Sequence, residues 1–190
     1  MCMAKFINIE PIGRNHTMKN RDEFIQEKIA EKDRIERMQL RGIQKFVYEV
    51  LTKDKGFHPD EIQVNPQFMV KLPGTEKRAT IDFIISFEKT NVIVVLCVSA
   101  GIASWERYAI AFARAIADYQ IPYAVITDGE EARISDVLSN SSRLISVQDL
   151  FTREDAYMRM SNFQKVTLPE KRRDMERRII LAFEAIKCRV

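Results

Sequence analysis

The segment between residues 80 and 127 constrains the fold most, because its hydrophobic periodicity changes twice. Residues 80–87 alternate in polarity, with Ile81, Phe83, Ile85 and Phe87 on one face, as in a half-buried strand. A tight connection leads to residues 92–98, which are apolar on both faces and indicate a central strand. A helix over 101–119 and a short strand over 122–127 follow. The pattern predicts a hairpin, then a helical crossover to a parallel strand, and therefore an α/β fold.

The flanking segments predict further elements around this centre. A helix is expected over residues 21–55, with an apolar stripe of Ile25, Ile29, Met38, Ile43, Phe46, Val47, Val50 and Leu51. One strand is expected over 61–72, interrupted by Pro66, another over 144–147, and then a helix near Gln148. A capping box at Thr167 opens a last helix, for which we predict an apolar side of Met175, Ile179, Ala182, Phe183 and Ile186.

These elements suggest three parts. Residues 1–20 form an N-terminal arm that includes a short β-like piece over 6–9, residues 21–150 form one domain, and residues 151–190 form a helical extension. The extension is expected to pack on the domain or on a second copy of the chain.

Composition limits the functional classes. Of 190 residues, 46% are hydrophobic, which is enough for a packed core, and the net charge of +3 does not by itself require a nucleic-acid partner. Three cysteines without a CxxC pair, Cys2, Cys97 and Cys188, favour a reducing compartment over a disulfide framework. His16 and His58 are too far apart in sequence to suggest a metal site. The longest apolar stretch is too short to span a bilayer, so we expect a cytoplasmic protein with no membrane partner.

An ordered set of local motifs resembles a known family. The motifs are Arg37 to Arg41, then Lys55-Gly56-Phe57, then Arg78-Ala79-Thr80-Ile81-Asp82, then Arg107-Tyr108-Ala109 and Ile126-Thr127-Asp128-Gly129. Together with the order of elements they resemble the N-terminal nuclease domain of type I restriction enzyme R subunits, in the PD-(D/E)XK superfamily. The resemblance implies a restriction-endonuclease-like fold, a mixed central sheet flanked by helices.

The resemblance also implies where a metal site would lie. In that family an Asp at the end of the second strand and a Glu-x-Lys on the third hold Mg²⁺ and activate water. Asp82 fits the first position, as a catalytic or metal-binding residue, but the Glu-x-Lys position falls on Leu96-Cys97-Val98. Leu96 and Val98 cannot ligate a hard cation, so we expect a vestigial site with no cofactor, and Mg²⁺ only if ligands have moved.

Two alternatives stay open for this site. Glu106 on the following helix, with Lys71 and Lys77 or Arg78 near the turn, could rebuild it. Alternatively Asp82 caps a loop or pairs with Arg78, Glu106 lies on a solvated helix face, and Lys71 is a surface lysine. Cys97 is expected to pack rather than react.

Basic residues provide the candidates for DNA contact. Besides Lys77 and Arg78, the last helix carries Lys171, Arg172, Arg173 and Arg177. The competing interpretation is a solvated helix whose cations are balanced by Glu170, Asp174 and Glu176.

Three functions compete. The first is a catalytically degenerate domain that binds DNA or a protein partner. The second is an active Mg²⁺-dependent endonuclease with relocated ligands around Asp82. The third is a structural or oligomeric protein, such as a homodimer, with no nucleic-acid role.

Overall fold

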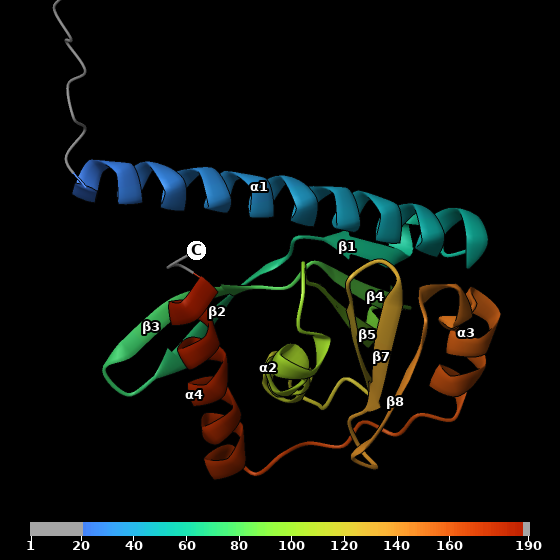
Figure 1. Ribbon diagram of the computed structural model, residues 1–190. Helices are drawn as coiled ribbons and strands as arrows, with labels where there is room; N and C mark the ends of the chain where they lie inside the picture. Colours follow the sequence, from blue (N-terminus) through green and yellow to red (C-terminus); the bar gives the residue numbers. More distant parts are fainter. Residues whose placement is uncertain (1–20, 188–190) are drawn as a thin grey trace, which may run out of the picture.

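The computed structural model describes residues 21–187, and within them one mixed sheet forms the centre of the molecule (Figure 1). Its strand order is β1-β4-β5-β6-β7-β8. The bounds are Ile62–Val64 (β1), Phe83–Phe87 (β4), Thr90–Cys97 (β5), Tyr123–Thr127 (β6), Glu131–Asp136 (β7) and Ser141–Ser146 (β8). β5 and β6 run parallel and the other neighbours are antiparallel. The expected fold class, the β4–β5 hairpin and the parallel crossover are confirmed.

Helices cover both faces of the sheet. One face packs against α2 (Ile102–Ala115) and α4 (Glu170–Lys187) in a core that includes Leu96, Phe112 and Ile180. The other face packs against the end of α1 (Arg21–Glu49), the π-helical turn Val50–Asp54 and α3 (Arg153–Ser161). Short 3₁₀ turns, Pro59–Glu61 and Val147–Asp149, complete the connections.

Several predicted boundaries were wrong. The strand expected over 61–72 is two strands, because the chain turns at Asn65, whose φ of 49° lies in the left-handed region that asparagine tolerates. The second half, β2 (Gln67–Leu72), pairs instead with β3 (Thr75–Thr80) in a separate two-stranded sheet. The expected strand over 80–87 begins only at Phe83. Ile81 therefore packs on the α2 side of the sheet, opposite to Phe83.

Other differences lie later in the chain. Strand β7 was not predicted from the sequence, and the helix expected near Gln148 is a 3₁₀ turn followed by α3. α2 ends at Ala115, before the expected Tyr119. The β-like piece at residues 6–9 lies outside the described residues.

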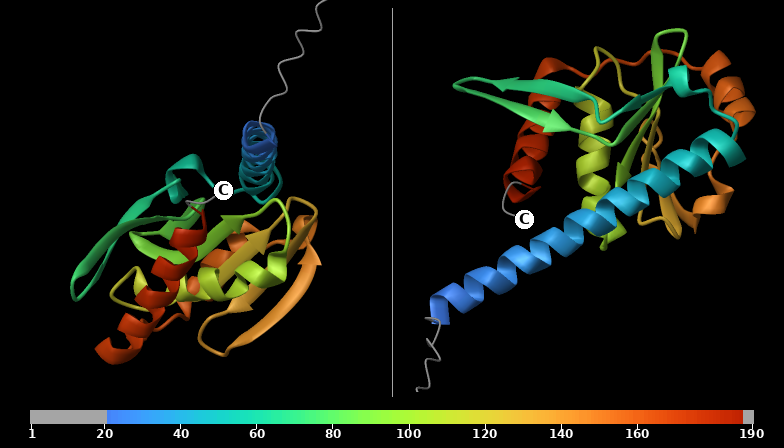
Figure 2. Two further views of the ribbon diagram at one scale, coloured as in Figure 1. Left: turned by 60° about the vertical axis from the view of Figure 1, so that its left-hand side comes forward. Right: turned by 90° about the horizontal axis from the view of Figure 1, so that it is seen from above.

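The first and last helices present different faces from those predicted. On α1, Val47, Val50 and Leu51 are buried as expected, but Ile25, Ile29, Met38 and Phe46 are exposed. The N-terminal half of α1 extends beyond the rest of the molecule (Figure 2). On α4, Met175 and Ile186 are exposed, and the buried residues are Glu176, Ile180 and Glu184. Ile179 and Phe183 pack against the core as expected, but two acidic residues share the buried side of α4, which hydrophobic periodicity does not detect. Within residues 21–187 no helix is both long and apolar enough to cross a bilayer.

Candidate active site

Asp82 lies between the β2–β3 hairpin and the central sheet, immediately before β4. The main-chain N–H of Asn65 donates to the Asp82 carbonyl oxygen over 2.7 Å, which fixes the turn between the two sheets. The side chain is 9% exposed and points toward β5 and α1, where both of its oxygens find donors. The break in the predicted strand thus places a carboxylate inside the fold.

Protein donors occupy both carboxylate oxygens of Asp82. Gln44 Nε2 donates to Oδ1 over 2.5 Å, and the Cys97 N–H donates to Oδ2 over 2.6 Å. Burial raises the pKa of Asp82 above its ordinary value, and these hydrogen bonds and the charge of Lys187 offset only part of the rise. The carboxylate therefore holds α1 to the C-terminal end of β5.

A cavity of about 490 Å³ adjoins Asp82. Glu36, Arg37, Leu40 and Gln44 of α1 line it, together with Asn65, Thr80, Asp82, Leu96, Cys97, Val98, Ser99, Trp105 and Lys187. The structure thus brings together Asp82, Leu96 and Val98, the three positions that the family resemblance assigns to the site. Leu96 and Val98 join the apolar core on the α2 side. Burial raises the pKa of the Cys97 thiol well above its ordinary value, so the thiol stays protonated and unreactive.

The last turn of α4 supplies a second polar cluster next to the cavity. Glu184 Oε1 accepts from the Thr80 N–H over 3.3 Å and from the Tyr108 hydroxyl. Lys187 Nζ donates to the Thr80 carbonyl oxygen over 3.1 Å and to the Tyr108 hydroxyl oxygen over 2.9 Å. Burial raises the pKa of Tyr108, and the neighbouring carboxylate of Glu184 raises it further. The cluster ties α4 and α2 to the strand end that precedes Asp82.

The residues present do not fit a divalent metal ion in this geometry. Asp82 has both oxygens engaged, and Leu96 and Val98 offer no oxygen ligand. Across residues 21–187 there is no group of three or more His, Cys, Asp or Glu side chains that could hold a metal ion. Mg²⁺ needs several oxygen ligands in near-octahedral geometry, and one shielded carboxylate cannot supply them.

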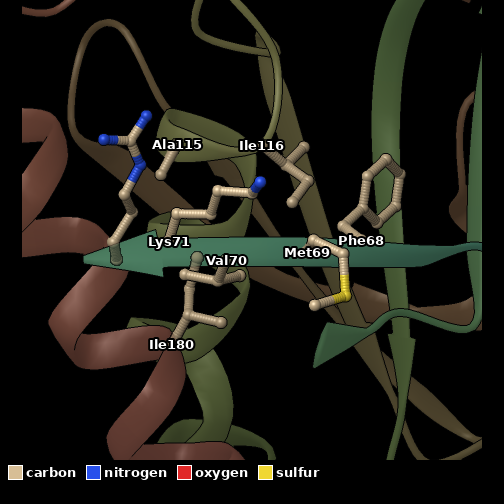
Figure 3. Close-up of a pocket in the computed structure, with 8 residues that line it drawn as sticks. Phe68, Met69, Val70, Lys71, Ala115, Ile116 and Ile180 are labelled. Atoms are coloured by element: carbon tan, nitrogen blue, oxygen red, sulfur yellow. The ribbon is translucent and has the colours of Figure 1, made fainter. Parts of the chain in front are cut away.

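The other residues that were proposed for a rebuilt site lie elsewhere. Glu106 accepts from Ser135 Oγ over 3.0 Å and pairs with Arg133. Both partners lie on β7, so the side chain of Glu106 is directed toward β7 and not toward Asp82. Lys71 pairs with Glu76 on the hairpin at 3.1 Å. Figure 3 shows Lys71 beside Val70, Ala115 and Ile180 at a separate hollow of about 240 Å³. Neither residue lines the Asp82 cavity.

The candidate DNA-contacting residues divide into two groups. Lys77 and Arg78 are exposed on β3, and Lys171 and Arg172 are exposed at the start of α4. Arg173 and Arg177 are half-buried and already engaged. Arg173 donates to the Asp118 carbonyl oxygen over 2.8 Å, and Arg177 pairs with Glu170 and Asp174 at 2.5 and 2.8 Å. For these two arginines the structure favours the balanced-helix interpretation.

The sequence-based interpretation missed several residues of the site. Gln44 carried a detectable signal, since it interrupts the inward apolar stripe of Leu40, Ile43 and Val47 with a polar side chain that needs a buried partner. Glu36 and Arg37 lie about two turns before Gln44 on the same helix, so helical spacing could have identified them as well. Lys187 had no such signal, because it reaches the cavity from the far end of the chain.

Comparisons with known proteins identify one family and one similar solved structure. A sequence model described as type I restriction enzyme R protein N terminus matches residues 42–150, which span the C-terminal part of α1, the whole central sheet and α2. Among solved structures, the chain is similar to a fragment described as an HsdR subunit of a type I restriction enzyme from Vibrio vulnificus YJ016, with 16% identity and a TM-score of 0.48.

That likeness covers 60% of this chain but only 23% of the solved chain, so the protein corresponds to a small part of its structural relative. A search of curated proteins gives no match. The family match covers more than half of the 190 residues and includes Asp82, Leu96 and Val98. The chain therefore belongs to the family of type I restriction enzyme R protein N-terminal domains.

Proposed function

We propose that this chain, as a member of this family, binds DNA but does not cleave it. The observation that carries the proposal is the state of Asp82, whose two carboxylate oxygens accept from Gln44 and from the Cys97 N–H. A metal-binding carboxylate would have to give up both hydrogen bonds, and Leu96 and Val98 would add no ligand beside it. We therefore assign Asp82 a structural role.

The DNA contacts in this proposal come from exposed cations. Lys77 and Arg78 project from the β2–β3 hairpin, which extends to one side of the sheet (Figure 2). No ion pair of either residue occurs within residues 21–187. Such side chains neutralise phosphates without reading sequence, so the binding should weaken as salt increases.

Fluorescence anisotropy with a labelled duplex tests the proposal. We expect the wild-type chain to bind at low salt, and the Lys77→Ala/Arg78→Ala double variant to bind more weakly with a shallower salt dependence. The control is Lys53→Ala/Lys89→Ala, which removes the same charge from exposed positions outside the hairpin. If the wild-type chain does not bind DNA at low salt, the proposal fails. An equal loss in both double variants would reject the hairpin as the contact surface.

The second candidate is a metal-dependent nuclease, and one observation favours it. Glu36 lines the same cavity as Asp82, and Lys187 reaches that cavity from α4, so an acid and a lysine other than those of the Glu-x-Lys position are available nearby. Incubation of supercoiled plasmid with Mg²⁺ or Mn²⁺ distinguishes the two functions. We expect intact plasmid. Cleavage that disappears in both Asp82→Asn and Glu36→Gln would establish the nuclease, whereas cleavage that survives Asp82→Asn would point to contamination or to another site.

A further inference from the structure

The projecting half of α1 is a helix without a covering element. From Arg21 to Lys32, every residue whose side chain the structure describes is exposed, and the segment stands clear of the sheet (Figures 1 and 2). A solitary helix of this length is only marginally stable in water, and most helices in proteins owe their stability to packing. The surface of this segment indicates the kind of partner that would cover it.

An apolar stripe runs along the outer side of α1. Phe24, Ile35, Met38 and Phe46 are between 43% and 66% exposed. At 3.6 residues per turn these side chains fall on one face, about a third of a turn away from Leu40, Ile43 and Val47, which face the sheet. A helix that packed on the stripe from Phe24 to Met38 would therefore avoid the domain, whereas Phe46 lies next to the turn at Gly129.

Gly42 lies on the same stripe and has no role within the molecule. Its backbone is helical, and a Cβ added there would meet nothing within 4 Å. Glycine in a helix interior costs up to about 1 kcal/mol relative to alanine. Its usual compensation is the close approach of another chain, which an exposed face of this helix would permit.

The charges beside the stripe are arranged symmetrically. In the first half of the helix, acids occur at four-residue spacing: Glu23, Glu27 and Glu31. In the second half, bases occur at the same spacing: Arg37, Arg41 and Lys45. The two sets are mirror images about position 34. In an antiparallel pair of identical helices, Glu23 would face Lys45, Glu27 would face Arg41, and Glu31 would face Arg37 of the other copy.

The apolar residues give nearly the same register. Pairing about Ile35 places Ile35 against its own copy and Phe24 against Phe46, in a register that is two residues away from the one that the charges give. The same register sets Lys28 opposite Gly42, where the lysine stem would cross the glycine backbone. In the register that the charges give, Arg34 instead meets its own copy near the axis, with the two Glu31 carboxylates one turn away.

We propose that α1 is the interface of a homodimer, in which two copies pair antiparallel about a twofold axis near Arg34 and Ile35. Such an interface is isologous, so each residue pair occurs twice. A partner of another sequence would not account for the match between the two halves of one helix. This inference is independent of DNA binding, which we assign to the β2–β3 hairpin.

Charge reversal tests the register directly. In sedimentation equilibrium we expect the wild-type chain to be a dimer, and Glu27→Arg or Arg41→Glu to weaken dimerisation at least about tenfold, because each change creates two like-charge pairs. The Glu27→Arg/Arg41→Glu double variant restores opposite charges at both places and should dimerise again. Lys53→Glu, an exposed change outside α1 that alters the charge as much as Arg41→Glu does, should have no effect.

A crosslink checks the orientation. In a chain with Cys2 and Cys188 replaced by serine, Ile35→Cys should form an intermolecular disulfide under mild oxidation, whereas Phe24→Cys alone should not. Efficient crosslinking through Phe24→Cys would indicate a parallel pair and overturn the proposal. A monomeric wild-type chain at all accessible concentrations, or a dimer that Arg41→Glu and Glu27→Arg leave intact, would overturn it as well. Circular dichroism of every variant confirms that a loss of dimer is not a loss of fold.

Discussion

Asp82 is an acid enclosed by the fold, and its environment sets the pH dependence that we expect. Because burial raises its pKa above the ordinary value of 3.8, folding favours the protonated form. The contribution of Asp82 to stability is therefore complete below the unfolded-state pKa and is lost as pH rises through the higher, folded-state pKa. Above that folded-state pKa the protein carries the cost of an ionised, buried carboxylate.

Replacing Asp82 by asparagine should remove that cost. An asparagine side chain can accept from the Cys97 N–H and donate to the Gln44 amide oxygen after that amide turns over, so both contacts survive. We expect Asp82→Asn to equal the wild-type chain in stability at acidic pH and to exceed it by about 1 kcal/mol at neutral pH. Urea unfolding at both pH values measures this difference, and Asp54→Asn, at an exposed position, is the control. A stability gain that is constant with pH would show that ionisation of Asp82 is not the cause.

Removing the hydroxyl of Tyr108 tests how much the polar cluster at the end of α4 contributes to stability. It lies between the Thr80 carbonyl oxygen, Glu184 and Lys187, and the tyrosine is fully buried. We expect Tyr108→Phe to lower the free energy of unfolding by about 1–3 kcal/mol, because Glu184 loses a buried donor. Tyr157→Phe, at a residue that is 40% exposed, should change the same quantity by less than about 0.5 kcal/mol. Equal effects in the two variants would contradict a special role for the cluster.

The sequence-based interpretation identified the residues at the strands of the site but not the residues of α1 and α4 that surround Asp82. The family resemblance assigned Asp82, Leu96 and Val98 to one site, and the β4–β5 hairpin, which alternation and a short connection predict, brings them together. The partners of Asp82 depend on where α1 and α4 dock, and docking is a tertiary property. A single buried amide such as Gln44 carries little weight in a periodicity pattern. Lys187 is separated from Asp82 by more than half of the chain.

At the scale of elements, regular apolar patterns were reliable and mixed ones were not. β5, whose residues from Val92 to Cys97 are all buried, was placed to within two residues at each end. β7 escaped notice because its six residues include Glu131, Arg133 and Asp136, and only three of the six are buried. The face of α4 was misjudged for a related reason, since its contacts with α2 are ionic as well as apolar.

Two glutamates of α4 provide a matched comparison of buried and exposed ion pairs. Glu176 is 8% exposed and accepts from Arg107 and Arg114 at 2.5 and 3.3 Å, whereas Glu170 pairs with Arg177 at the surface. We expect Glu176→Ala to reduce the free energy of unfolding by about 2 kcal/mol, because two arginines lose their shared partner. Glu170→Ala should cost at most about 1 kcal/mol. Chemical denaturation of both variants decides this, and a larger loss for Glu170→Ala would mean that α4 is not anchored through α2.

The whole molecule extends past the segment that defines its family, and the two ends should matter unequally. The family match spans residues 42–150, so the projecting half of α1 and all of α4 lie outside it. Only α4 covers the core, through Ile180 and through its polar contacts with α2 and Thr80. A chain that ends at residue 168 loses Ile180, and truncating one such buried residue alone costs about 2–5 kcal/mol. We expect it to be unfolded or readily cleaved by protease.

A chain that begins at residue 34 should instead keep the stability of a full-length monomer, because it removes only the projecting part of α1. Thermal unfolding followed by circular dichroism, at concentrations too low for dimerisation, compares the two truncations. The same N-terminal truncation removes Glu23, Glu27 and Glu31, so it should remain monomeric at concentrations where the full chain pairs. A folded chain without α4 would show that α4 is not needed to complete the core. An N-terminal truncation that unfolds would show that the projecting helix supports its own body and not a second copy.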